Sequence, residues 1–186
     1  MDYQTGDDFS GSSFLSEPGT YHLMVQAIDE APTNNNGQLI DGALFRAQCS
    51  VLAGTVAGQE DKEVALTYFA PKPSAKDGGK FGRKKVDRFL LAVGLIGDDA
   101  KGKQVAIDLQ AAIGRHFIAH LEGREYDGKT YLEVAFADTF HVDSAEAKSY
   151  PKNENAMKLP APWRKVSAKP AAATNGRPAA ALADVL

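Results

Sequence analysis

The feature that most constrains this chain is a strict two-residue alternation across residues 43–52. Small and apolar side chains fill every second position there, namely Ala43, Phe45, Ala47, Cys49 and Val51. Side chains of a β-strand point alternately to its two faces, so this pattern predicts a strand with one buried face and one mixed, polar face. Such a strand has to pair within a sheet whose apolar face is covered.

Four more segments have the composition of strands, at residues 20–28, 62–69, 116–125 and 130–142. The last two are joined by Asp127-Gly128, a dipeptide favoured in tight hairpin turns. The side chains expected to face inward are Leu23, Val25, Ala27, Phe117, Ala119, Leu121, Leu132, Val134 and Phe136. In the segment 62–69, Val64, Leu66 and Tyr68 share one face, and Ala65, Thr67 and Phe69 share the other. The side chains expected to face outward on the last hairpin are His116, Ile118, His120, Tyr131 and Glu133.

Between the third and fourth strands the period changes to that of a helix. Apolar residues spaced three and four apart predict a helix over residues 81–96, and a second helical turn is expected over 105–113. Three strands, a helix and two strands do not make the alternation typical of a parallel α/β sheet. The order predicts an all-β fold, a five-stranded OB-fold barrel with one main helix, although SH3-like barrels and simple meanders share it.

Composition divides the chain into three parts. Residues 1–16 are a polar arm and 17–146 hold the predicted barrel, while 147–186 are rich in Pro, Ala and Lys. The last part has too few aliphatic residues to offset its ordering entropy, so we expect a disordered tail. The acidic N-terminus does not resemble a secretory signal, and no run is long and apolar enough to cross a membrane. With a single cysteine, these features favour a reducing cytoplasm.

Charge is segregated along the chain although the net charge is only −3. Residues 1–30 contain six acids and no Lys or Arg, whereas residues 72–88 contain seven bases and two acids. A local charge of +5 is a footprint typical of contact with a polyanion.

Three segments carry a family resemblance. They are Phe9-Ser10-Gly11 with the following Pro18-Gly19-Thr20-Tyr21, the basic helix ending in residues 89–95, and the hairpin at 123–131. Together they resemble phage and prophage replication-module proteins similar to the single-stranded-DNA-binding proteins of tailed phages, over roughly residues 9–145. The resemblance implies an OB fold, DNA as the ligand and the cytoplasm of a bacterial host.

Binding a single strand without sequence preference requires cations for the phosphates and aromatic faces for the bases. The residues expected to make these contacts are Tyr21, Arg46, Gln48, Phe69, Lys72, Lys76, Lys80, Arg83, Lys84, Lys85, Arg88, Arg115, Arg124, Tyr126, Lys129 and Tyr131. Each ring could instead belong to the core and each cation to a solvated helix face; Phe45, Phe117 and Phe136 are assigned to the core outright.

No residue pattern indicates catalysis, a metal or a cofactor. His116 and His120 have zinc spacing only on a helix, and in a strand they stand about 13 Å apart. His22 and His141 have no ligand partner at a suitable spacing, and Cys49 lies on the inward register. The acidic pairs Asp7-Asp8 and Asp98-Asp99 lack a third carboxylate for Mg²⁺.

The sequence therefore predicts a non-catalytic protein that coats single-stranded DNA in phage replication or recombination, with replication or recombination proteins as further partners. The exposed strand edges of a partly open barrel also allow a homodimer. The alternatives are an adaptor that uses the same barrel to hold a protein, as a recombinase-loading or virion component, and an enzyme such as a nuclease.

Overall fold

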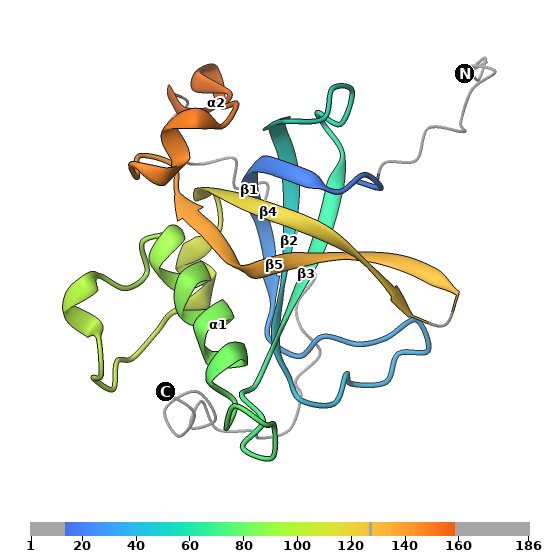
Figure 1. Ribbon diagram of the computed structural model, residues 1–186, viewed down its shortest axis with the longest axis vertical. Coiled ribbons are helices and arrows are strands. Elements are labelled where there is room, and N and C mark those ends of the chain that lie inside the picture. The colour runs from blue at the N-terminus through green and yellow to red at the C-terminus, as the bar shows by residue number, and fades with distance from the viewer. Residues whose placement is uncertain (1–13, 127, 159–186) are drawn as a thin grey trace, which may run out of the picture.

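A computed structural model describes residues 14–126 and 128–158, and a single antiparallel sheet dominates it (Figure 1). Its strands are β1 (Gly19–Asp29), β2 (Ala43–Gly54), β3 (Glu63–Phe69), β4 (His116–Tyr126) and β5 (Lys129–His141). Neighbours in the sheet follow the order β3-β2-β1-β4-β5. The five predicted strands are confirmed within a few residues, and the protein is β-rich with an open sheet.

The helices are short apart from α1 (Lys80–Ala92), which packs mainly against β5. The others are the 3-10 turns η1 (Asp98–Ala100), η2 (Leu109–Ala112) and η3 (Glu146–Ser149), and the five-residue helix α2 (Glu154–Lys158). The predicted helix ends earlier than residue 96, because Gly94 adopts a positive φ of 65° just after the last turn. The helical turn expected over 105–113 contracts to the four residues of η2.

An aromatic cluster fills the space between α1 and the sheet. The ring of Phe89 lies 4.7 Å from that of Tyr68, 5.4 Å from that of Phe45 and 5.5 Å, edge-on, from that of Phe117. Phe45 and Tyr68 stack at 4.8 Å. The predicted core roles of Phe45 and Phe117 are confirmed, and the side chain of Phe136 lies outside the described residues.

One predicted inward position on β1 is wrong. Leu23 and Val25 are buried as expected, but Ala27 is exposed and Ile28 is buried instead. The pairing of β1 with β2 shifts between Val25 and Ala27, which marks a β-bulge. An extra residue reverses the side-chain alternation that follows it, and the periodicity of a single strand does not reveal it.

The outer face of β1 and β4 is covered by the chain after β5. Ile118, expected to face solvent, is fully buried in a small second core with Val142 and Ala147. The backbone N–H of Asn153 donates to Nδ1 of His22 at 3.0 Å, and the Asn153 amide reaches the carbonyl of Leu52 at 3.4 Å. The boundary predicted at residue 147 is therefore too early, because packing continues to residue 157; residues 159–186 lie outside the described part.

A similar correction applies to the predicted arm 1–16. Leu15 is buried, and its N–H donates to the carbonyl of Glu63 at 2.8 Å beside the start of β3. Residues 1–13 of the arm lie outside the described part.

The covered face contains a buried histidine pair. Nε2 of His22 lies 3.1 Å from Nδ1 of His116, and since Nδ1 of His22 accepts from Asn153, neutral His22 donates through Nε2. Burial, followed by the nearby charges of His116 and Lys152, lowers the pKa of His22 from 6.5 to about 4; burial also lowers the pKa of His116.

We predict that this pair makes the fold acid-sensitive. Below pH 6.5 His22 is protonated in the unfolded chain, whereas in the folded protein it stays neutral until about pH 4. The free energy of unfolding therefore falls as the pH drops from 6.5 to about 4. Urea unfolding at several pH values measures it. His22→Gln, which does not titrate, should flatten the slope, whereas His141→Gln at an exposed position should not; equal slopes in wild type and His22→Gln would contradict the prediction.

Candidate functional site

A groove of about 370 Å³ opens where the end of β3, the connection 70–79, the start of α1 and the β4–β5 hairpin meet. The residues that give it its chemistry are Phe69, Lys72, Phe81, Lys85, Arg124 and Glu133. Four of them, Phe69, Lys72, Lys85 and Arg124, were predicted from the sequence to contact a nucleic acid. The structure thus brings together residues from four separate segments.

The connection before α1 is folded back tightly to form one wall of the groove. Gly79 has φ of 80°, and a Cβ there would lie 2.9 Å from the backbone N of Lys72, so only glycine fits without a shift. The Asp77 carboxylate accepts from the N–H groups of Gly79 at 3.0 Å and Phe81 at 2.6 Å. These contacts hold Lys72 beside the first turn of the helix.

Three accessible aromatic rings lie in or beside the groove. Phe69, Phe81 and Tyr131 are 44%, 39% and 51% exposed, which is unusual for large apolar residues. Tyr131 pairs directly with Arg124 across the hairpin, so the two share a face. Phe81 was missed by sequence reasoning; the available signal was its place in the first helical turn, away from the apolar stripe.

The cations of the groove already have partners. Lys85 Nζ lies 5.2 Å from the centre of the Phe81 ring, and 3.9 Å from Oε1 of Glu133. Arg124 Nη1 lies 3.6 Å from Oε2 of the same carboxylate. Glu133 therefore bridges a cation of the helix and a cation of the hairpin.

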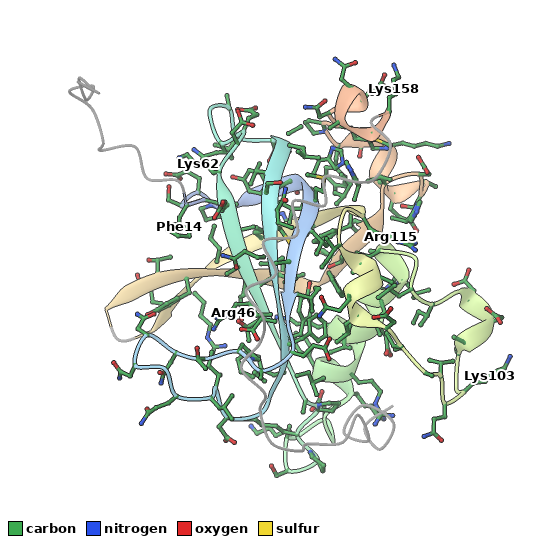
Figure 2. All side chains as sticks on the ribbon, turned by 180° about the vertical axis from the view of Figure 1, so that it is seen from behind. Phe14, Arg46, Lys62, Lys103, Arg115 and Lys158 are labelled. Carbon is green, nitrogen blue, oxygen red and sulfur yellow. The ribbon has the colours of Figure 1, made fainter. Side chains whose placement is uncertain are left out.

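The polar face of β2 lies next to β3, but neither Arg46 nor Gln48 lines the groove itself. Arg46 donates from Nε to Oγ1 of Thr67 at 3.3 Å, and Thr67 lines the groove with Phe69. Arg46 also donates to the carbonyl of Thr33, which ties it to the loop between β1 and β2. Gln48 lies two residues further along the same face of β2. Both views show this loop beside the β4–β5 hairpin (Figures 1 and 2).

Lys76 is exposed on the connection that lines the groove, and Lys80 and Lys84 are exposed on α1. The side chains of Tyr126 and Lys129 lie outside the described residues, so their predicted contacts stay predictions.

Tyr21 cannot act as a stacking platform as predicted. Its ring is fully buried, and its hydroxyl donates to the carbonyl of Glu17 at 2.7 Å. The position of Tyr21 near a strand end suggested that its ring is accessible. Instead the ring fills the space beside Gly54 of β2, where a Cβ on Gly54 would lie only 2.3 Å from the ring.

Arg115 lies at the opposite end of α1 from the groove and has a structural role. Its Nη1 donates to the carbonyls of Val93 and Gly94 at 3.2 and 3.3 Å, and its Nε to that of Ala111 at 3.1 Å. Figure 2 shows Arg115 well separated from Arg46. Arg115 directly precedes β4, but its side chain caps the last turn of the helix and does not line the groove.

Arg83 and Arg88 also lie away from the groove. Arg83 lines a second cavity of about 250 Å³, between α1 and the loop 96–107. The pKa of Glu146 is lowered by hydrogen bonds of its own backbone and of Ser144, and further by the charge of Arg88, which places Arg88 on the side of α1 near η3.

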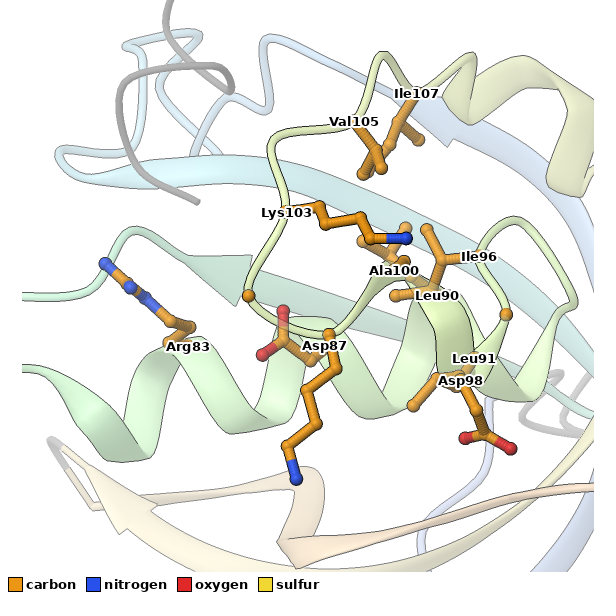
Figure 3. A pocket seen from close by; sticks show the side chains of 13 residues that line it. Arg83, Asp87, Leu90, Leu91, Ile96, Asp98, Ala100, Lys103, Val105 and Ile107 are labelled. Atoms are coloured by element: carbon orange, nitrogen blue, oxygen red, sulfur yellow. The ribbon is translucent and has the colours of Figure 1, made fainter.

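The second cavity combines an aliphatic floor with a charged rim. Leu90, Ile96 and Ile107 contribute to the floor, and Lys103 extends across it (Figure 3). Burial raises the pKa of Asp87 at its edge, while Arg83 acts in the opposite direction.

The histidines and the cysteine have structural partners. His120 Nδ1 lies 2.9 Å from Oγ1 of Thr20, whereas His116 pairs with His22. Cys49 is fully buried, and burial raises the pKa of its thiol. Among residues 14–126 and 128–158, no three His, Cys, Asp or Glu side chains are grouped to hold a metal ion. No helix in the same part of the chain is long and apolar enough to cross a membrane.

A scan against models of known protein families gives no match for this chain, and a search of curated proteins gives no significant match.

We predict that Arg115→Met lowers the free energy of unfolding by about 1–2 kcal/mol, because it removes charged hydrogen bonds from helix-end carbonyls. Urea denaturation measures the loss. Lys103→Met, on the exposed loop beyond α1, should change it by less than about 0.5 kcal/mol. The same loss in both variants would contradict the assigned cap.

Proposed function

We propose that this protein binds single-stranded DNA without catalysing a reaction, as a component of a phage-type replication or recombination module. The observation that carries the proposal is the groove itself. It places three cations, Lys72, Lys85 and Arg124, beside the exposed rings of Phe69 and Phe81. Cations attract a phosphate chain and open rings stack on unpaired bases, a combination that favours a single strand over a duplex.

We further propose that the sheet is an OB-type barrel. The strand order β3-β2-β1-β4-β5 and the position of α1 between β3 and β4 agree with that fold. The two outermost strands, β3 and β5, approach within 8 Å between Cα atoms, although they do not pair in the sheet order. In OB barrels, ligands lie across the second and third strands between two neighbouring loops, which here would include Arg46 and Gln48.

The alternative, a protein-interaction adaptor, is favoured by the second cavity. Its aliphatic floor and charged rim on the far side of α1 suit a protein segment better than a phosphate chain. The two functions can be separated by charge, because Lys85 in the groove and Arg83 and Arg88 outside it lie on the same helix.

We predict that Lys72→Gln/Lys85→Gln/Arg124→Gln weakens binding of labelled oligo-dT by more than about tenfold at about 50 mM salt, and reduces the salt slope by about 2, near 0.7 for each lost phosphate contact. Fluorescence anisotropy measures both. The control Arg83→Gln/Arg88→Gln/Lys103→Gln changes the net charge equally outside the groove and should cost less than about threefold. Equal losses would indicate a diffuse charge effect, and absence of wild-type binding would exclude the function.

A second prediction concerns the rings. Phe69→Ala and Phe81→Ala should each weaken oligo-dT binding by about 5- to 150-fold, the equivalent of about 1–3 kcal/mol for one stacked base. Phe14→Ala is the matched control, because Phe14 is 56% exposed but lies at the opposite end of β3 beside Glu63. Unchanged affinity in both groove variants would show that the bases do not stack there.

A further inference from the structure

Glu133 is an acid at the centre of a cationic groove. Each oxygen of its carboxylate faces a different cation, Oε1 toward Lys85 at 3.9 Å and Oε2 toward Arg124 at 3.6 Å. Lys85 comes from α1 and Arg124 from β4, so the carboxylate faces cations of two elements that form the groove. A surface selected only for attraction of polyanions would not carry an acid in this place.

The strand register makes this position costly in itself. Glu122 of β4 lies directly opposite Glu133 of β5, and like charges in directly opposed positions destabilise a sheet. The two cations offset this repulsion. A neutral side chain at position 133 would avoid it altogether, so sheet stability does not account for the glutamate.

The contacts of Glu133 are also easily exchanged. Both distances exceed hydrogen-bond length, and the side chain is 38% exposed, while that of Arg124 is 67% exposed. Ion pairs of this kind contribute about 0–1 kcal/mol each. A phosphodiester can approach Arg124 and Lys85 to hydrogen-bond distance, and charge-assisted bonds to arginine and lysine are about twice as strong as neutral ones.

We propose that Glu133 is an internal competitor of phosphate: it occupies Lys85 and Arg124 in the free protein, and the backbone of a bound strand displaces it. This inference rests on the proposed function of the groove. An isolated phosphate gains only the exchange of one anion for another. A nucleic-acid strand also stacks its bases on Phe69 and Phe81, so it gains more than it displaces. Glu133 thereby selects a polymer with accessible bases over small anions.

The test compares Glu133→Gln with Glu122→Gln. Both variants remove one acid from the same cross-strand pair and relieve the same repulsion, but Glu122 forms no ion pair within the described residues. Affinity for labelled oligo-dT, oligo-dC and oligo-dA is measured by anisotropy over a range of salt concentrations. Circular dichroism and thermal unfolding verify that both variants are folded, and Glu133→Ala serves as a second variant.

Glu133→Gln should bind all three oligonucleotides about fivefold more tightly at low salt, the equivalent of about 1 kcal/mol for the released pairs. Its salt slope should become steeper by about 1, because no displaced carboxylate takes up cations. Inorganic phosphate should compete better against Glu133→Gln than against wild type. Glu122→Gln should change affinity by less than about twofold.

Equal effects of the two substitutions would overturn the inference, as would weaker binding by Glu133→Gln. Weakening confined to oligo-dC would show instead that the carboxylate accepts a hydrogen bond from the base edge. These outcomes leave wild-type binding, and therefore the proposed function, intact. Binding by neither the wild type nor Glu133→Gln would overturn both.

Discussion

The packing of Phe89 against the sheet is the interaction on which the rest of this structure depends. Its ring contacts Phe45 and Tyr68 of the β2–β3 pair and Phe117 of β4, so it joins α1 to both halves of the sheet. Aromatic rings bury large areas in restricted geometries, and this cluster therefore fixes the helix in orientation as well as in position. The first two turns of α1, with Phe81 and Lys85, are held beside β3 and β5 as a consequence.

The groove arises because a well-anchored helix follows a tightly folded connection. Gly79 allows the backbone to approach Lys72, and Asp77 caps the first turn. Without this reversal the basic residues of the connection would extend away from the sheet. Local backbone geometry thus brings together cations that the sequence shows only as a run of lysines and arginines. Glu133 then determines how strongly two of these cations, Lys85 and Arg124, interact with a ligand.

Other parts of the sheet contribute to the stability of the fold rather than to the groove. The chain after β5 covers β1 and β4, buries Ile118 and donates a hydrogen bond to the fully buried His22 of the His22–His116 pair. The guanidinium group of Arg115 donates hydrogen bonds to the carbonyls at the end of α1. The division is physical, because a ring enclosed in the core has no surface to offer a ligand, whereas Phe69, Phe81 and Tyr131 are partly exposed.

Periodicity and turn chemistry determined the strands, the main helix and most of the core, because each depends on neighbouring residues: Phe45, Ala47, Cys49 and Val51 all face inward as their spacing predicts. Charge segregation likewise indicated Lys72 and Lys85. Only the tertiary structure decided which cations share a groove, because that depends on contacts between distant segments. In the folded protein Arg124 lines the groove and Arg115 does not, and Glu133 lies between two cations. The ring of Tyr21 is part of the core, whereas that of Phe81 is exposed. The bulge in β1 and the burial of Ile118 could not be predicted from the sequence for the same reason. The pattern of a single strand does not show which segments pair with it or cover it.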